Sequence, residues 1–560
     1  PTDPQHSYVV LDPDVLALHP GLQTVVASGA VSNTVAFGQT NDVLAWLGGL
    51  SYTRVSVDPK TLELTTQRVD ASQSAKDAPT AAAAQDAKIV SPAGSDMWLG
   101  ESTVAKSQAA LSMKLNSSQS VIISSDGKSP APSVISVSWP IPGVQFLWMD
   151  STILMIAGGG FLLLGIALYL WALLHMRRGQ GPRRRGGGRM PKPPRPRRIR
   201  ASKISLTGPA RGRRAIGPGS SMVAAALGGL LVVSLSACSP AATTVTPSPT
   251  PTSTNDPVND GPSPVVSEAQ LQVILKKVTQ TIALADKNKD LPLISTRFAG
   301  AALEARAANY AMRKTNAKLP AIPGLSTSPV QLFLPQTTQL WPRSILAMVA
   351  ASEAAKKGEQ PPTVAVVMTQ ETPRSNYKIV YTTDLEANQR TPEVAAATLG
   401  TPLVALDTKL LRLSPTELAA AYGDLLNKGD NSQFVDVFDS AGDTLRPRIA
   451  AERKGQQSNK QVRVTFADVT GASSPVAFAT MDAGAIVSVQ LNEIGTFTPL
   501  NNRDLKLTGE LKALSGIEIS NRAVRATYGL QLFMYVPPVG SAKRVQMLGY
   551  SEDLTSVRLR

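Results

Sequence analysis

The sequence predicts a multidomain membrane protein with a β-rich N-terminal domain, a two-helix transmembrane hairpin and an α+β C-terminal region. Two long apolar segments, 151–176 and 215–238, contain no acidic or basic residue apart from one histidine and predict the hairpin. In residues 267–560, apolar residues first recur at helical spacing and then alternate with polar residues as in strands, which predicts the α+β class. At 560 residues, the chain is too long for a single hydrophobic core.

Cysteine and histidine usage excludes several kinds of site. Cys238 is the single cysteine, so the chain has no intramolecular disulfide and no CxxC metal motif. The three histidines, His6, His19 and His175, all precede it, which excludes histidine-dependent triads and histidine-ligated metals from the largest region. We therefore predict no catalytic residue, no cofactor and no metal ligand.

The basic charge is local. The net charge of +15 arises in residues 177–214, which contain 15 Lys and Arg and leave 41 basic against 41 acidic residues elsewhere. This stretch has no aromatic residue on which a base could stack, so we predict no nucleic-acid partner.

Residues 1–150 are predicted to form a β-rich domain with a polar, alanine-rich loop at 71–87. Trp46 and Trp98 each precede a Leu-Gly pair, and we favour core packing over a binding site for both. The candidate strands alternate or are flanked by turn residues: Tyr8–Leu11, Gln23–Ala27, Tyr52–Val57, Val121–Ser124 and Val134–Trp139.

Segment 151–176 is long enough to cross a bilayer, since 26 residues of helix span roughly 39 Å. Arg177 and Arg178 follow it, and the basic end of a span stays in the cytoplasm. Residues 1–150 are therefore expected outside. Because Pro1 is not an initiator, we also expect a signal peptide or another span upstream.

Residues 177–214 are predicted to be a disordered cytoplasmic loop, because Gly and Pro interrupt them and no apolar periodicity remains. The loop is expected to contact anionic lipid headgroups. Segment 215–238 then returns through the membrane, and the Ser/Thr/Pro-rich stretch 239–266, with seven prolines, is an extended linker outside it.

The second apolar segment ends in Leu-Ser-Ala-Cys, residues 235–238, which resembles the lipobox of bacterial lipoproteins. That resemblance implies cleavage before Cys238 and lipidation of its thiol. A lipoprotein signal is N-terminal, however, whereas this one is internal. Two alternatives stay open: an uncleaved second span, or a separate lipoprotein that begins at Cys238.

Residues 267–560 contain a diverged internal repeat. Ser267 and Ser414 each begin a capping box and an amphipathic helix. Phe298 and Phe438 each follow an aspartate by eight residues. Arg306 and Arg448 lie shortly after these phenylalanines. We predict that each links its helix to its own sheet rather than binding an anion.

Each copy continues into strands. The predicted strands are Ile345–Ala350, Thr363–Thr369, Tyr377–Asp384, Val462–Val469, Ala485–Leu491, Leu505–Leu511, Ala523–Val536 and Lys543–Tyr550. Segments 341–344 and 373–375 share a Pro-Arg-Ser motif at strand entries. This order of elements resembles tandem NTF2-like domains, 267–400 and 401–560. The whole layout resembles uncharacterised actinobacterial cell-envelope membrane proteins.

The resemblance implies two functions of different classes. The first is a non-enzymatic, membrane-anchored scaffold or binding protein of the bacterial envelope with an envelope protein or polymer as partner, as in the NTF2-like outer domains of conjugation-type secretion proteins. The alternative is an enzyme that modifies an envelope lipid or glycan inside the NTF2-like cone, with Asp482 or Glu493 as base and Tyr528 or Tyr535 as oxyanion donor. We favour the scaffold, and a cone filled with apolar side chains would support it.

Overall fold

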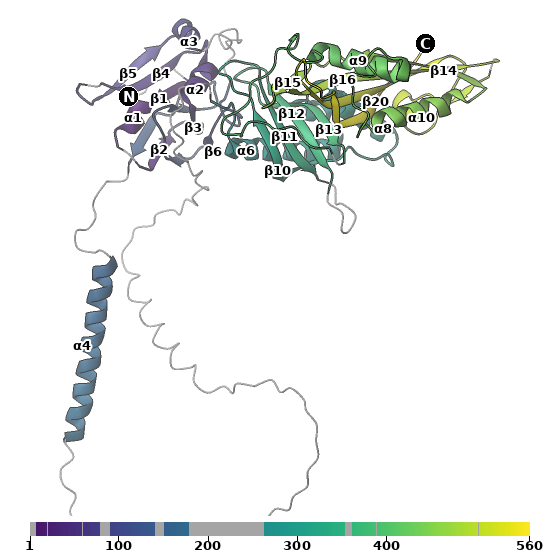
Figure 1. Cartoon of the computed structure of the whole chain (residues 1–560). Coiled ribbons are helices and arrows are strands. Elements are labelled where there is room, and N and C mark those ends of the chain that lie inside the picture. The colour runs from purple at the N-terminus through teal and green to yellow at the C-terminus, as the bar shows by residue number, and fades with distance from the viewer. Residues whose placement is uncertain are drawn as a thin grey trace, which may run out of the picture. The chain divides into compact units, whose positions relative to one another are not determined.

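The computed structural model describes residues 7–19, 21–58, 60–78, 90–139, 151–178, 263–352, 361–387, 389–501 and 503–560, and side chains of the long apolar helix over 158–175 (Figure 1). The chain divides into two compact units. One combines Pro1–Pro140 with Thr250–Arg560, and the other is Ile141–Pro249.

The N-terminal region is β-rich, as predicted. A six-stranded sheet has the order β5-β4-β1-β8-β3-β6, and a three-stranded sheet has the order β7-β2-β9. The elements are β1 Tyr8–Leu11, α1 Pro13–Ala17, β2 Gln23–Ser28, β3 Ser32–Gln39, α2 Thr40–Leu47, β4 Tyr52–Val57, β5 Leu64–Val69, α3 Ala71–Asp77, β6 Gly100–Ala105, β7 Ala109–Met113, β8 Gln119–Ser124 and β9 Val134–Ser138.

Several N-terminal elements were not predicted. β3 was missed because most of its residues are buried on both faces, so the alternation that marks a half-buried strand is absent. β5 was missed because its residues are almost all exposed and polar. α3 occupies the start of the predicted loop at 71–87, while residues 79–89 lie outside the described residues.

The second unit contains one long apolar helix, α4 (Ser151–Arg178). Residues Gly158–His175 of this helix have a mean hydropathy of 1.7, and none of them is buried against the rest of the protein. The helix is therefore long enough and apolar enough to cross a membrane. The predicted basic loop beyond Arg178, the second apolar segment 215–238 with Cys238, and most of the linker 239–266 lie outside the described residues. Among the residues that the structure describes, one helix is a candidate membrane span, and the second helix of the predicted hairpin is not tested.

The C-terminal region repeats one order of elements, helices first and strands afterwards. The helices are α6 Glu268–Asn288, α7 Leu291–Ser295, α8 Gly300–Thr315, α9 Pro415–Lys428, the 3-10 helix η2 Gly429–Asn431, α10 Leu445–Gln457 and α11 Gly509–Ser515. The predicted capping box forms at the start of α6, where Gln270 N–H donates to Ser267 Oγ (3.3 Å) and Ser267 N–H donates to Gln270 Oε1 (3.0 Å).

The strands of both halves join into one nine-stranded sheet with the order β10-β11-β12-β13-β20-β19-β16-β14, and β15 pairs β16 beside β14. The two halves meet where β13 pairs antiparallel with β20. The strands are β10 Leu325–Pro335, β11 Arg343–Ala351, β12 Thr363–Gln370, β13 Lys378–Leu385, β14 Val462–Thr470, β15 Val476–Ala479, β16 Ala485–Pro499, β19 Val524–Val536 and β20 Gln546–Leu559, with β17 Leu505–Lys506 and β18 Ile519–Ser520 as a separate pair.

Equivalent contacts occur in both halves. Phe298 forms a parallel bridge with Ile379, and Phe438 forms a parallel bridge with Val545. Phe298 therefore attaches the segment between two helices to β13, and Phe438 attaches its segment to the residue just before β20. The repeated spacing in the sequence has this contact as its structural counterpart.

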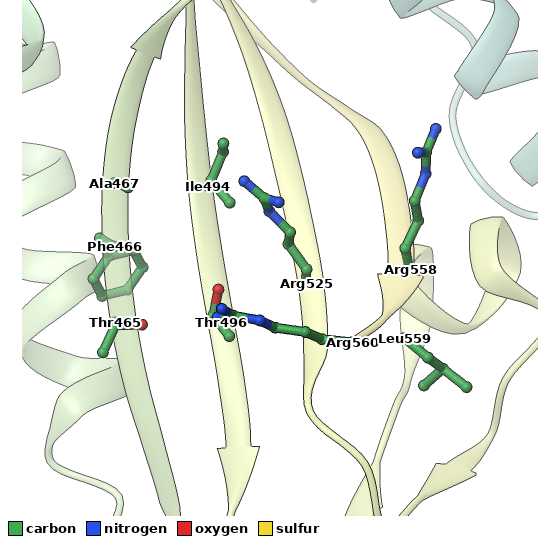
Figure 2. Close-up of a pocket in the computed structure, with 9 residues that line it drawn as sticks. All are labelled: Thr465, Phe466, Ala467, Ile494, Thr496, Arg525, Arg558, Leu559 and Arg560. Carbon is green, nitrogen blue, oxygen red and sulfur yellow. The ribbon is translucent and has the colours of Figure 1, made fainter.

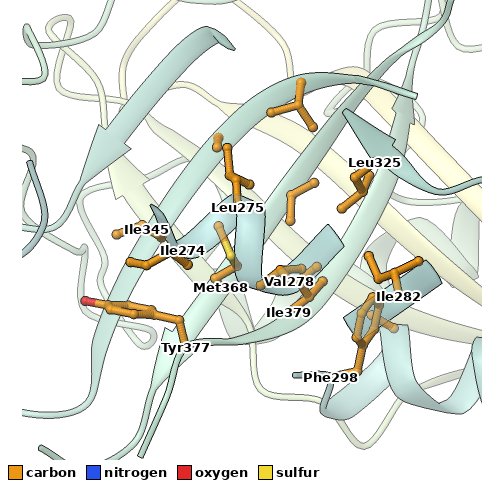
Figure 3. Close-up of a cluster of buried hydrophobic side chains, with 14 of the residues drawn as sticks. Ile274, Leu275, Val278, Ile282, Phe298, Leu325, Ile345, Met368, Tyr377 and Ile379 are labelled. Atoms are coloured by element: carbon orange, nitrogen blue, oxygen red, sulfur yellow. The ribbon is translucent and has the colours of Figure 1, made fainter. Parts of the chain in front are cut away.

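Apolar side chains fill the space between helices and sheet in each half. In the first half, Ile274, Leu275 and Val278 of α6 pack against strand residues such as Ile345 and Met368 (Figure 3). In the second half, α9 and α10 pack in the same way against β16 and β19. A further core contains residues of both halves: Leu334, Leu346, Met348, Ala365, Val367 and Tyr381 from the first, and Phe478, Ile486, Phe533, Tyr535 and Leu548 from the second.

One predicted strand is wrong. Residues 505–511 were expected to be a single strand, but only Leu505–Lys506 is strand, and α11 begins at Gly509. Leu511 and Leu514 lie three residues apart, which places both on one helical face against the cluster around Met312 and Ala526. Tertiary packing therefore decides the conformation of this short segment.

Candidate functional site

Three tryptophans gather where the N-terminal region meets the first half of the C-terminal region. Trp341 belongs to the same buried cluster as Tyr8, Trp46 and Trp98. The ring centroids of Trp46 and Trp98 are 5.8 Å apart. Trp46 and Trp98 pack in a core, as predicted, and they also contact the C-terminal region, because the same cluster contains Trp341. We call this contact region the junction.

Asp96 is the buried centre of the junction. Its side chain is 0% exposed and forms an ion pair with Arg297, whose Nη2 donates to Asp96 Oδ1 (3.2 Å). Lys277 Nζ lies 3.6 Å from the same oxygen, and the Tyr377 N–H donates to Asp96 Oδ2 (3.0 Å). A buried carboxylate requires this number of partners, because burial without them is costly.

Two further arginines extend the junction, and both come from the Pro-Arg-Ser motifs. Arg343 Nη2 pairs with Asp42 Oδ1 (2.8 Å), and its guanidinium stacks 3.6 Å from the ring centroid of Trp341. Arg374 donates from Nε to the Trp46 carbonyl (2.8 Å) and from Nη2 to the Gly48 carbonyl (2.6 Å). Burial lowers the pKa of Arg374, and Tyr8 opposes that effect.

The sequence marked the tryptophans and both motifs of the junction but did not indicate that they meet. It missed Asp42, Asp96 and Arg297. The available signal for Asp96 was an aspartate two residues before a tryptophan and between turn residues. Sequence spacing could not show that its partners lie about 200 positions away.

The structure brings Asp482 and Tyr535 together, as the enzyme alternative requires. The Tyr535 hydroxyl donates to Asp482 Oδ2 (2.6 Å), and Thr480 and Lys543 donate to the same carboxylate at 2.7 and 2.9 Å. Burial raises the pKa of Asp482, but these hydrogen bonds outweigh it, so the pKa lies well below its usual range. Such a carboxylate is a weak proton acceptor, and it is 36% exposed at a turn.

Glu493 and Tyr528 are opposite each other on β16 and β19. Glu493 is committed to Arg453, whose Nε lies 2.6 Å from Oε1, while Arg453 Nη2 lies 2.7 Å from Asp468 Oδ2. Burial raises the pKa of Glu493, and Arg453 lowers it. This buried group is a structural ion-pair cluster that joins α10 to β14 and β16.

The two repeated arginines have different partners. Arg448 on α10 pairs with Glu552 on β20, so it ties its helix to its own sheet as predicted. Arg306 on α8 instead donates to Asp286 at the end of α6 (2.8 Å) and therefore ties one helix to another. The prediction is right for the second copy and wrong for the first, because the first copy has an acid on the neighbouring helix.

An arginine-lined pocket of about 380 Å³ lies on the second half of the sheet (Figure 2). We call it the arginine pocket. Register places Thr465, Thr496, Arg525 and Arg558 in one row across β14, β16, β19 and β20. Arg560 lines the same pocket, and its side chain extends toward Thr496 in Figure 2.

Arg525 and Arg558 are a like-charged pair directly opposite each other on neighbouring antiparallel strands, an arrangement that is destabilising by itself. Within the described ranges, no carboxylate forms an ion pair with either of them or with Arg560. Two arginine forks and two threonine hydroxyls are donors that match an anionic oxygen group. Sequence reasoning missed this pocket because its residues come from four separate strands.

The remaining predicted site residue, Cys238, lies outside the described residues. Over the part of the chain that the structure describes, no group of three His, Cys, Asp or Glu side chains is placed to hold a metal ion.

Comparison with known protein families gives a match over the C-terminal region. A family described as a domain of unknown function, DUF8094, matches residues 262–558, which is more than half of the chain and corresponds to the two helix–sheet halves. No curated protein matches the chain, and no solved structure matches it.

Proposed function

We propose that this chain, which belongs to the DUF8094 family, is a membrane-anchored, extracytoplasmic scaffold or binding protein of the bacterial cell envelope that holds an anionic envelope component in its arginine pocket. The observation that carries the proposal is the row of Arg525 and Arg558 beside Thr465 and Thr496. A protein retains unopposed like charges on adjacent strands at a cost in stability, and an anionic ligand offsets that cost.

A non-enzymatic role fits the filled interior of both halves. The space between α6 and its strands, and between α9, α10 and theirs, is occupied by apolar side chains. The enzyme alternative needs a carboxylate and a donor that face an open cavity. Asp482 and Tyr535 meet at a partly exposed turn instead, and Glu493 is paired with Arg453. We propose further that each half is an NTF2-like domain whose cone serves as a packed core.

Membrane anchoring is supported by α4, whose apolar window Gly158–His175 is long enough to span a bilayer. With Arg177 and Arg178 at its cytoplasmic end, residues 1–150 and 239–560 would be extracytoplasmic and the loop 177–214 would face anionic lipid headgroups.

The fate of Cys238 separates two versions of this proposal. Segment 215–238 remains as a second span in one, and in the other the chain is cut and lipidated at Cys238. An immunoblot of a C-terminally tagged chain distinguishes them. A single full-length band that Cys238→Ala leaves unchanged contradicts the lipoprotein version.

The proposed binding function is tested by crosslinking in native membranes followed by capture of the tagged chain. We expect an anionic envelope protein or polymer to be captured with the wild type and to be reduced about tenfold or more with Arg525→Glu/Arg558→Glu, because charge reversal turns attraction into repulsion. The matched control, Lys287→Glu/Lys314→Glu, makes the same change of charge at two exposed helix positions. Equal capture by both double variants contradicts the role of the pocket, and absence of any captured component contradicts the scaffold function.

A further inference from the structure

We propose that the junction is a docking surface that works between separate chains, so that the N-terminal region 7–139 and the C-terminal region 263–560 stay bound one to one after the segment between them is cut. This inference concerns a different surface from the arginine pocket and does not rest on the proposed function. It names the partner of the first C-terminal half, which is the N-terminal region itself.

The two sides of the junction contribute charges of opposite sign. Both carboxylates, Asp42 and Asp96, belong to the N-terminal region, and both are paired. The cations belong to the first C-terminal half: Lys277, Arg297, Arg343 and Arg374. Neither face is able to pair with a copy of itself, because like charges would then meet. The division therefore selects a heterologous contact.

Burial makes the pairing specific. Asp96 is 0% exposed and Arg297 is 7% exposed, so each charge has lost its water. Removing one partner leaves the other charge buried and uncompensated. The aromatic cluster of Trp46, Trp98 and Trp341 supplies apolar area around these pairs, which is the usual composition of an interface that holds without a covalent link.

The second half of the C-terminal region lacks an arginine at the position equivalent to Arg297. Arg297 immediately precedes Phe298, whereas the residue before the equivalent Phe438 is Val437. A valine offers no donor to a buried carboxylate. The N-terminal region therefore has one docking position on the two repeated halves, and we expect a one-to-one complex.

The experiment uses the full chain in detergent, with a site-specific protease sequence inserted within 240–256 and Cys238→Ala to prevent other processing. After cleavage, we expect the two products to coelute in size-exclusion chromatography at micromolar concentration. Separate elution of two folded products overturns the proposal.

Dilution of the cleaved complex then measures its Kd in two matched variants. Asp96→Asn removes the fully buried one of the two junction carboxylates and is expected to raise the Kd about 30-fold or more. Asp468→Asn removes the carboxylate of the buried Arg453 pair away from the junction and is expected to leave the Kd within about threefold of the wild type. Equal effects of the two substitutions overturn the assignment of affinity to the junction charges.

Arg374→Met is a second junction variant, in case Asp96→Asn disturbs folding. Its guanidinium donates to the Trp46 and Gly48 carbonyls of the N-terminal region and lies 5.7 Å from the centroid of the Trp46 ring. The substitution therefore leaves the ion pair between Asp96 and Arg297 in place. We expect a rise in Kd of about fivefold or more with an unchanged circular dichroism spectrum. An unchanged Kd contradicts docking through this surface.

Discussion

Asp553 on β20 illustrates how burial, as the largest of several effects, changes the chemistry of one residue. Burial raises the pKa of its carboxyl group to about 6, against the opposing effect of Arg306, and the neighbouring carboxylates of Asp384, Glu510 and Glu552 raise it further. The folded protein therefore binds this proton more tightly than the unfolded chain does. The resulting stability is fully present below the pKa of the unfolded chain, near 4, and is lost as pH rises through about 6.

This pH dependence of stability gives a prediction for Asp553→Asn, because the asparagine side chain is neutral at every pH. The variant should gain free energy of unfolding relative to the wild type as pH rises from about 4 to 7.5, by on the order of 1–3 kcal/mol. Urea unfolding at several pH values measures the difference. Asp407→Asn, at an exposed position, is the control and should show no such trend. A constant difference between Asp553→Asn and the wild type contradicts the assignment.

At the scale of elements, the pairing of β19 with β20 includes a repulsion between like charges. Arg525, near the start of β19, lies directly opposite Arg558, near the end of β20. Opposite charges at the same positions would stabilise the pair of strands by a few tenths of a kcal/mol up to about 1 kcal/mol. Binding and strand stability therefore place opposite demands on these two positions.

Arg558→Glu tests that opposition. We expect the thermal midpoint to rise at low ionic strength and the gain to shrink in about 1 M salt, where exposed charges are screened. Capture of the anionic component should fall in the same variant. A lower midpoint at low salt would show that the arginine pair is not strained. The comparison is Arg390→Glu, which makes the same change of charge at an exposed position outside the pocket lining.

At the scale of the whole molecule, the junction couples regions that are more than 100 residues apart in sequence. The N-terminal region and both C-terminal halves form one compact unit. Shared buried ion pairs make the unfolding of one region expose charges of the other, which favours a single cooperative transition.

Unfolding followed by two probes tests this coupling. Three of the six tryptophans lie at the junction, so about half of the fluorescent side chains report on it, whereas far-ultraviolet circular dichroism reports on the whole chain. We expect the two transitions to coincide in the wild type and to separate in Asp96→Asn, with the N-terminal region destabilised by about 3–5 kcal/mol. Coincident transitions in the variant contradict the coupling, and Asp468→Asn should leave them coincident.

The sequence predicted features that depend on local pattern and failed where distant packing decides. The capping box of Ser267 and the alternating strand that became β19 were predicted because their signals lie within one element. β10 was missed because Pro329 interrupts its pattern, and this proline is tolerated because β10 is an edge strand. The row of Arg525 and Arg558 and the pairing of Asp96 with Arg297 depend on register and docking, which spacing along the chain does not encode.

The pairing of β13 with β20 has a consequence for how the two halves are related. Each half contributes its last strand to the contact and leaves its first strand, β10 or β14, at an outer edge. This is the isologous contact that a two-fold axis creates in a homodimer, here enclosed within one polypeptide. Such a contact closes on itself, because both copies use the same surface. A third copy therefore has no equivalent place to join, in contrast to a solenoid, which extends by adding identical neighbours.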